Sequence, residues 1–195
     1  MNKIRKGNFG YIAYQRKASL LRTILFFALS LAIYGIGIYS TGSNKNLLTV
    51  VAVLGLLPAC KSAVNVIMFF RASGCSDEAK HALENFDSSL GGLYDIYLTS
   101  FDKKSGKYQK NYPLSHLVVK GNVICALTEK AGCDTQAGEK HIVQMLAQDG
   151  YKNMTVKIFS ERSKYIDRLG QLQNLKSEEN KQTKGIYQML LAIAL

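Results

Sequence analysis

The chain contains 195 residues, has a hydrophobic fraction of 47%, and carries a formal net charge of +11 at pH 7. Nine Lys or Arg and no acid precede residue 74, whereas the remaining 16 bases and 14 acids leave the rest of the chain near neutral. A DNA-binding domain concentrates positive charge on its own surface, so this distribution disfavours nucleic acid as the main partner. The four cysteines include no C-x-x-C pair, which argues against a zinc ribbon or a thioredoxin-type site and fits a reducing compartment.

Two hydrophobic stretches follow a basic juxtamembrane segment at residues 1–19. Residues 20–40 read LLRTILFFALSLAIYGIGIYS, and residues 47–70 read LLTVVAVLGLLPACKSAVNVIMFF. A helix needs roughly 20 apolar residues to cross a bilayer core about 30 Å thick, and each stretch is that long. The short link at residues 41–46 makes the two helices antiparallel. The first stretch is too long for a typical signal-peptide core, and a second span follows it directly. We therefore expect a transmembrane hairpin rather than a cleaved leader.

The basic residues predict how this hairpin is oriented. Five Lys or Arg lie before the first span and Arg71 follows the second, whereas the link between the spans carries only Lys45. Because Lys and Arg are retained on the cytoplasmic side, we expect both termini in the cytoplasm and the protein in the cell (inner) membrane. The same bases suit anionic lipid headgroups, so the bilayer is itself an expected partner.

Lys61 is an unusual residue for a transmembrane span. It lies three residues after Pro58 and four before Asn65, and Asn65 shares its helical face. An ionisable residue in a span commonly marks a functional contact, so Lys61 and Asn65 are candidates for an intramembrane polar contact with a partner helix. The alternative is a lysine that reaches toward the headgroups beneath a helix bent at Pro58. Both interpretations remain open at this point. The first span has small contact positions at Ser30, Gly35 and Gly37.

Residues 74–178 change in composition and predict a cytoplasmic α+β domain. Ser76 is a helix N-cap candidate with acids directly after it, and Gly91 and Gly92 end that helix. Runs of aromatic and β-branched residues predict strands, and apolar residues at helical spacing predict helices. The expected elements are a helix from residue 77, strands at 93–101, within 108–120 and at 123–129, a helix at 139–148, a strand at 154–159 and a helix at 161–177.

The stretch SHLVVKGNVICALTEK, residues 115–130, resembles a strand pair of the nuclease-related (NERD) domains, which have a restriction-endonuclease-like fold. The similar region extends over about residues 77–169. The resemblance implies that fold, attached here to a two-helix membrane anchor. It also implies a site in which two carboxylates hold a divalent metal that activates water, with a lysine beside them.

The acid positions of that site are not acidic in this chain. The resemblance places them at Ser115 and Thr128, which supply no anionic ligand, and only Lys130 matches. Glu129 is displaced by one residue, which on a regular strand directs it to the opposite face. The sequence therefore predicts a degenerate nuclease-like domain without a catalytic site, a metal or a cofactor.

The last residues, 179–195, form an apolar C-terminal segment. Its run GIYQMLLAIAL, residues 185–195, is too short to span a bilayer. We expect it to pack against its own domain, and docking to another protein or to lipid is the alternative.

These observations favour a membrane-anchored, non-catalytic binding or scaffold protein. Its expected partner is another protein or a second copy of the chain, with nucleic acid possible but not favoured. One alternative is a membrane-tethered, metal-dependent nuclease whose acids come from Asp95, Asp102 or Glu129. Another is an accessory subunit of a larger membrane complex, contacted through Lys61 and Asn65. The chain has no phosphate-binding glycine loop and no G-x-S-x-G motif.

Overall fold

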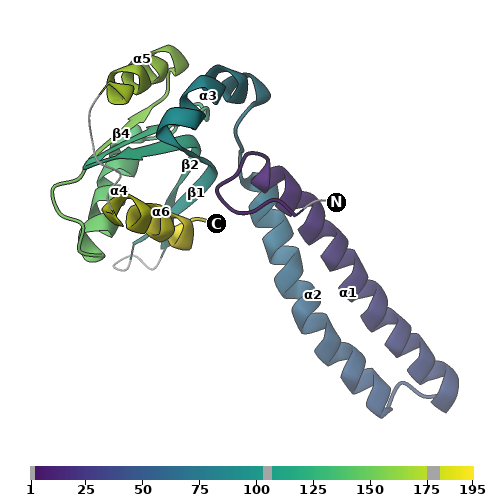
Figure 1. The fold of residues 1–195 in the computed structure, drawn as a ribbon. Coiled ribbons are helices and arrows are strands. Elements are labelled where there is room, and N and C mark those ends of the chain that lie inside the picture. Colours follow the sequence, from purple (N-terminus) through teal and green to yellow (C-terminus); the bar gives the residue numbers. More distant parts are fainter. Residues whose placement is uncertain (1–2, 103–106, 175–180) are drawn as a thin grey trace. The chain divides into compact units, whose positions relative to one another are not determined.

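The computed structural model describes residues 3–102, 107–174 and 181–195 of the chain (Figure 1). The chain divides into two compact units. One is helical and comprises Ile12–Ala72, and the other joins the first residues, up to Tyr11, to Ser73–Leu195.

The helical unit contains the two apolar helices that the sequence predicts. Helix α1 comprises Tyr11–Thr41 and helix α2 comprises Leu47–Arg71. Both are long and apolar enough to cross a membrane, and only 11% and 17% of their most apolar windows are buried within the protein. Helix α1 begins nine residues before the predicted span, and α2 continues through Pro58. Exposed apolar surface of this extent fits a lipid environment better than water.

The two helices of the hairpin contact each other at intervals of seven residues. A seven-residue contact repeat is the geometry of a coiled-coil pair, and small residues at such contacts let two membrane helices approach closely. A side chain at Gly55 would meet Ser30 Oγ at 2.9 Å, and one at Gly37 would meet Leu48 Cβ at 2.9 Å. The successive contacts are Arg16 with Phe69, Thr23 with Ser62, Ser30 with Gly55, and Gly37 with Leu48.

Polar side chains form hydrogen bonds with backbone groups at both ends of α2. Asn46 is its N-cap, and its Oδ1 accepts a hydrogen bond from the Thr49 backbone N–H at 2.7 Å. At the other end, the Arg16 guanidinium donates to the carbonyls of Phe69 and Ala72, at 3.3 and 3.1 Å. Terminal carbonyls of a helix lack partners within that helix, so Arg16 of α1 fixes the end of α2.

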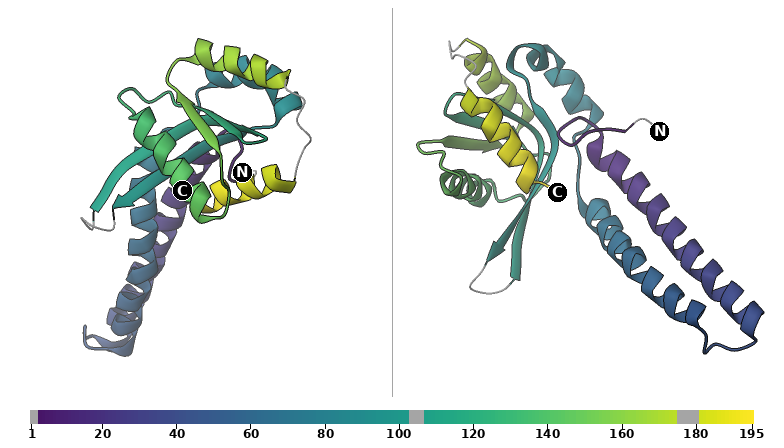
Figure 2. Two further views of the ribbon diagram at one scale, coloured as in Figure 1. Left: turned by 90° about the vertical axis from the view of Figure 1, so that its left-hand side faces the viewer. Right: turned by 60° about the horizontal axis from the view of Figure 1, so that its bottom comes forward.

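The second unit is built on a four-stranded mixed sheet in the order β1-β2-β3-β4. Strands β1 to β3 are antiparallel, whereas β4 lies parallel to β3 because helix α4 crosses between them. In the right-hand view of Figure 2, β1 and β2 continue together as a two-stranded arm beyond the rest of the sheet. The strands are β1 Leu93–Asp102, β2 Lys107–Lys120, β3 Val123–Leu127 and β4 Thr155–Phe159, and the helices are α3 Asp77–Leu90, α4 Thr135–Gln148, α5 Arg162–Gln173 and α6 Lys181–Ile193.

Helices cover both faces of this sheet and create two hydrophobic cores. One core lies under α4 and α6 and includes Ile142, Leu146, Ile186 and Leu190, all fully buried. The other lies under α3 and α5 and includes Leu83, Tyr165 and Leu169. The prediction that the C-terminal segment packs within its own domain is therefore confirmed.

In the α+β unit, the bounds of α4 and α5 also differ from the predicted ones. Helix α4 begins at Thr135 rather than at residue 139, because Asp134 caps it by accepting the Ala137 N–H at 3.0 Å. Helix α5 ends at Gln173. The end of the predicted helix, residues 175–177, lies outside the described residues.

The first residues of the chain belong to the α+β unit rather than to the helical one, so the predicted segment 1–19 divides at Tyr11. The Tyr94 N–H donates to the Gly7 carbonyl at 2.7 Å, and the Leu195 N–H donates to the Tyr97 carbonyl at 2.9 Å. The two ends of the chain thus pair with β1, which is an edge strand. An open edge strand invites pairing with other chains, and these contacts cover part of it.

Candidate functional site

The structure brings together two of the three positions suggested by the nuclease resemblance. Strands β2 and β3 pair His116 with Leu127, so the next residues along, Ser115 and Thr128, are neighbours across the strands. Both are buried, with exposed fractions of 4% and 1%. Lys130 is exposed, at a turn beyond the end of β3. The neighbouring pair supplies hydroxyl groups where the resemblance calls for carboxylates.

Regular strand alternation breaks at this point of the sheet. Leu114 and Leu117 both join the core under α4 and α6, although residues three apart on a regular strand face opposite sides. On the adjacent strand, Asp95 has a φ of +56°, an uncommon value for a residue with a side chain. Glu129 lies two residues beyond the end of β3 at Leu127, so strand alternation does not fix the direction of its side chain.

The two acids nearest this position hold the start of α3. Asp95 Oδ1 accepts the Cys75 backbone N–H at 2.7 Å. Glu129 Oε2 accepts the Ser76 N–H at 2.9 Å, and Glu129 Oε1 accepts the Ser76 hydroxyl at 2.6 Å. Ser76 is the N-cap of α3 and itself accepts the Ala79 N–H at 3.1 Å. Because a helix N-terminus carries partial positive charge, both carboxylates lie where an anion is favoured.

A basic residue completes the environment of Glu129. Arg162, at the start of α5, places Nη2 at 3.2 Å from Glu129 Oε1 and Nη1 at 3.6 Å from a carboxylate oxygen of Glu78. Burial would raise the pKa of Glu129, but the hydrogen bonds from Ser76, Ser115 and Arg162 outweigh burial and hold that pKa below its ordinary value. The carboxylate is therefore ionised and already surrounded by donors.

The neighbouring thiol is not activated. Burial, followed by the negative charges of Glu129 and Asp95, raises the pKa of Cys75 to about 12. The thiolate is the nucleophilic form of cysteine, so Cys75 is inert at neutral pH. Among the described residues, no group of three or more His, Cys, Asp or Glu is placed to hold a metal ion.

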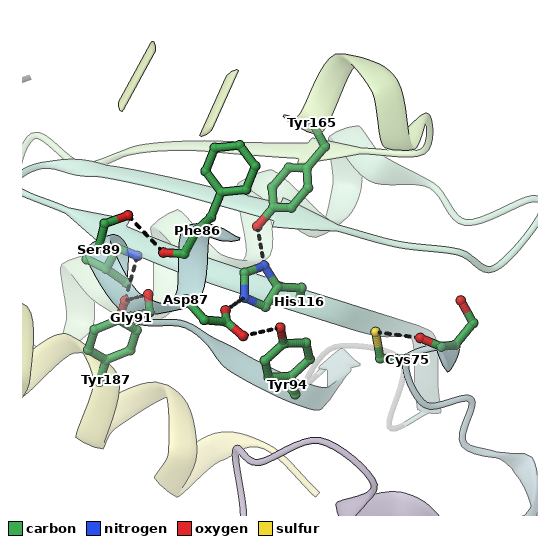
Figure 3. Close-up of polar contacts among 11 residues, drawn as sticks. Cys75, Phe86, Asp87, Ser89, Gly91, Tyr94, His116, Tyr165 and Tyr187 are labelled. Atoms are coloured by element: carbon green, nitrogen blue, oxygen red, sulfur yellow. Dashed lines mark hydrogen bonds and ion pairs between the residues drawn. The ribbon is translucent and has the colours of Figure 1, made fainter. Parts of the chain in front are cut away.

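A second polar cluster, which the sequence did not indicate, lies between the sheet and the helices α3 and α5 (Figure 3). His116 of β2 is fully buried. Its Nδ1 shares a hydrogen bond of 2.8 Å with the Tyr165 hydroxyl, and its Nε2 lies 3.3 Å from Asp87 Oδ1 without hydrogen-bond alignment. Tyr94 of β1 donates its hydroxyl to Asp87 Oδ2 at 2.5 Å. We call Asp87, Tyr94, His116 and Tyr165 the His116 cluster.

Within the His116 cluster, the histidine is fully buried and the Asp87 side chain is partly exposed. Burial would raise the pKa of Asp87, but His116 and Tyr94 outweigh it and hold that pKa below its ordinary value. Burial, followed by Asp87, raises the pKa of Tyr94, and burial raises that of Tyr165. Gly92 packs so closely on the imidazole that a side chain there would overlap Nε2. The cluster thus ties α3 and α5 to the sheet through a buried histidine.

In the hairpin, the polar contact between the helices is made by Thr23 and Ser62 and not by the predicted residues Lys61 and Asn65. Thr23 Oγ1 donates to Ser62 Oγ at 2.8 Å, and Ser62 contacts α1. Lys61 is exposed and Asn65 is half-buried. Lys61, one position before Ser62, therefore lies off the contact between the two helices.

Comparisons of this chain with family models, curated proteins and solved structures give no match. The interpretation of both polar groups consequently rests on their geometry.

Proposed function

We propose that this protein is a membrane-anchored, non-catalytic binding or scaffold protein that presents its α+β domain on the cytoplasmic side. The proposal rests on the hydrogen bonds that the carboxylates of Asp95 and Glu129 accept. Of the three acids named for the nuclease alternative, the Asp102 side chain lies outside the described part of the structure, and Asp95 and Glu129 both accept backbone N–H groups that precede α3. Carboxylates committed to holding a helix start are not free to bind metal and activate water.

The arrangement of the sheet supports a degenerate nuclease-like origin for the domain. The chain order is helix, three strands, helix, strand, and the strand order is β1-β2-β3-β4 with β4 parallel to β3. Ser115 and Thr128 directly follow the last pair of the β2–β3 ladder, His116 with Leu127. Replacing both acids with hydroxyls removes the charge that holds a divalent metal, because hard cations prefer anionic oxygen ligands.

The α+β unit retains surface suited to a protein partner. A cavity of about 440 Å³ lies between α4, β1 and the end of α6, and its lining combines apolar and amide side chains. The lining residues are Leu98, Thr99, His141, Gln144, Met145, Gln148 and Ile193.

The test of the proposal uses the full chain purified in detergent. Double-stranded DNA, single-stranded DNA and RNA are incubated with the protein in Mg²⁺ or Mn²⁺, and binding of each metal is followed by calorimetry. We expect neither cleavage nor metal binding, because Glu129 is already paired with Ser76 and Arg162. Metal-dependent cleavage that is lost in Glu129→Gln, but retained in Glu161→Gln, would establish the nuclease alternative instead.

A further inference from the structure

Two basic residues lie at the same level of the hairpin. Thr23 of α1 contacts Ser62 of α2, and each contact residue directly follows a base, Arg22 in α1 and Lys61 in α2. At 1.5 Å of rise per residue, the two antiparallel helices place these bases within about 3 Å of each other along the hairpin. Both side chains are exposed.

The two bases also point to the same side of the hairpin. Two antiparallel helices in contact are related by a twofold axis that is perpendicular to the plane of the two helix axes. This axis places the residue before each contact residue on the same side of that plane. The structure contains a direct check on this geometry. Leu31 and Leu56 each follow a contact residue by one position, and both line a single cavity of about 230 Å³. Arg22 and Lys61 therefore share the opposite side.

Asn65 extends this basic face. It lies four residues after Lys61, so the two side chains are neighbours on α2, and it is half-buried. The face thus offers a guanidinium, an ammonium and an amide. No acid occurs before residue 74, so neither this hairpin nor a second copy of it supplies a counter-ion.

The position of these bases along the hairpin indicates which negatively charged group pairs with them. Eighteen residues separate Thr23 from Thr41 at the end of α1, which is about 27 Å of helix. With the polar link at one boundary of a core about 30 Å thick, Arg22 lies close to the other boundary, and Lys61, about 21 Å along α2 from Leu47, lies between that boundary and the bilayer centre. Long basic side chains reach headgroups from such a position. This depth answers the question that the sequence left open about Lys61, because it favours headgroup contact over a contact at the bilayer centre.

We propose that Arg22, Lys61 and Asn65 form a binding site for the phosphate of an anionic phospholipid. Arginine contacts phosphate oxygens in pairs, lysine adds a compact charge, and the asparagine amide donates a further hydrogen bond. Basic sites between membrane helices hold acidic headgroups in this way. The site rests on the membrane insertion that is part of the proposed function.

The test measures lipid retained by the full chain. The protein is purified in mixed micelles of phosphatidylcholine and phosphatidylglycerol, and bound lipid is counted by native mass spectrometry. We expect the wild type to retain phosphatidylglycerol selectively. Arg22→Gln with Lys61→Gln lowers this retention about 25-fold, and Lys61→Leu lowers it about fivefold, because each substitution removes a direct charge-assisted contact with the bound phosphate.

Matched controls distinguish the loss of this site from a general loss of positive charge and from a failure of the hairpin to insert into the membrane. Lys17→Gln with Arg71→Gln also removes two bases from the same end of the hairpin and keeps wild-type retention. Alkaline carbonate extraction of each variant reports insertion separately, and Lys61→Leu makes the span more apolar, so it inserts. A variant found in the supernatant would count against the anchor. Wild-type retention of lipid by inserted Lys61→Leu and by the inserted double variant would overturn the site.

Two further results would also overturn the assignment to lipid. Displacement of phosphatidylglycerol by millimolar inorganic phosphate would indicate a site for free phosphate. A zero-length carbodiimide cross-link in native membranes, joining Lys61 to a carboxylate of another polypeptide, would indicate a partner helix. We expect neither.

Discussion

Glu129 accepts two hydrogen bonds from Ser76, one from the backbone N–H at 2.9 Å and one from the hydroxyl at 2.6 Å. This contact joins the segment after β3 to the start of α3, 53 residues earlier in the chain. The Glu129 carboxylate is therefore a fixed part of the domain.

Removing the charge of Glu129 should destabilise the α+β unit. Glu129→Gln weakens hydrogen bonds from Ser76 and the ion pair with Arg162, and we expect a loss of about 1–2 kcal/mol in the free energy of unfolding. Thermal or denaturant unfolding of the full chain in detergent measures this loss. The control is Glu161→Gln, an exposed ion-pair partner of Lys164, which should cost about 0.5 kcal/mol or less. Equal effects of the two substitutions would contradict the structural role.

Stability should also fall in acid because of Asp87 and Glu129. Both pKa values lie below their ordinary values of 3.8 and 4.5 in the folded protein. A carboxyl whose pKa is lowered by folding adds stability above its unfolded pKa and loses it as the pH falls through the folded pKa. We therefore expect the free energy of unfolding to decline below about pH 4.5. Asp87→Asn should make this decline less steep, and an unchanged slope would contradict the paired state of Asp87.

The close packing of Gly92 on His116 predicts opposite effects for two glycine substitutions. Gly92→Ala forces a methyl group against the imidazole and should cost about 1–3 kcal/mol. Gly170 lies inside α5, and a methyl group there would meet nothing within 4 Å. Gly170→Ala should therefore stabilise the protein by about 0.5–1 kcal/mol. Unfolding measurements on both variants test the His116 cluster, and a neutral Gly92→Ala would show that the cluster is not closely packed.

A similar pair of glycines tests the packing of the hairpin. A side chain at Gly55 would approach Ser30 Oγ at 2.9 Å, whereas one at Gly35 would meet nothing within 4 Å. Gly55→Leu should therefore separate the helices, and Gly35→Leu should not. Distances between spin labels placed on α1 and α2 measure the separation in bilayers. If both substitutions leave the distance unchanged, the seven-residue contact repeat is wrong.

Local patterns in the sequence were sufficient to predict most elements of the fold. Apolar length predicted α1 and α2, the Ser76 cap predicted the start of α3, and Gly91 predicted its end. These signals act over a few residues, so one sequence contains them. The start of α4 was predicted four residues late because the cap at Asp134 was not recognised.

The candidate sites depend on contacts that local patterns do not encode. Asp87 and His116 are 29 positions apart, and nothing in their spacing indicates that they meet. The break in alternation around Asp95 depends on a backbone angle that is uncommon for aspartate. Lys61 was recognisable as unusual, but its level with Arg22 became apparent only from the Thr23–Ser62 contact.

Alkaline carbonate extraction of native membranes tests the central claim most directly. We expect the full chain to stay in the membrane pellet and to be released only by detergent, because α1 and α2 expose apolar side chains along their length. Recovery of the intact chain in the supernatant, without detergent, would contradict it.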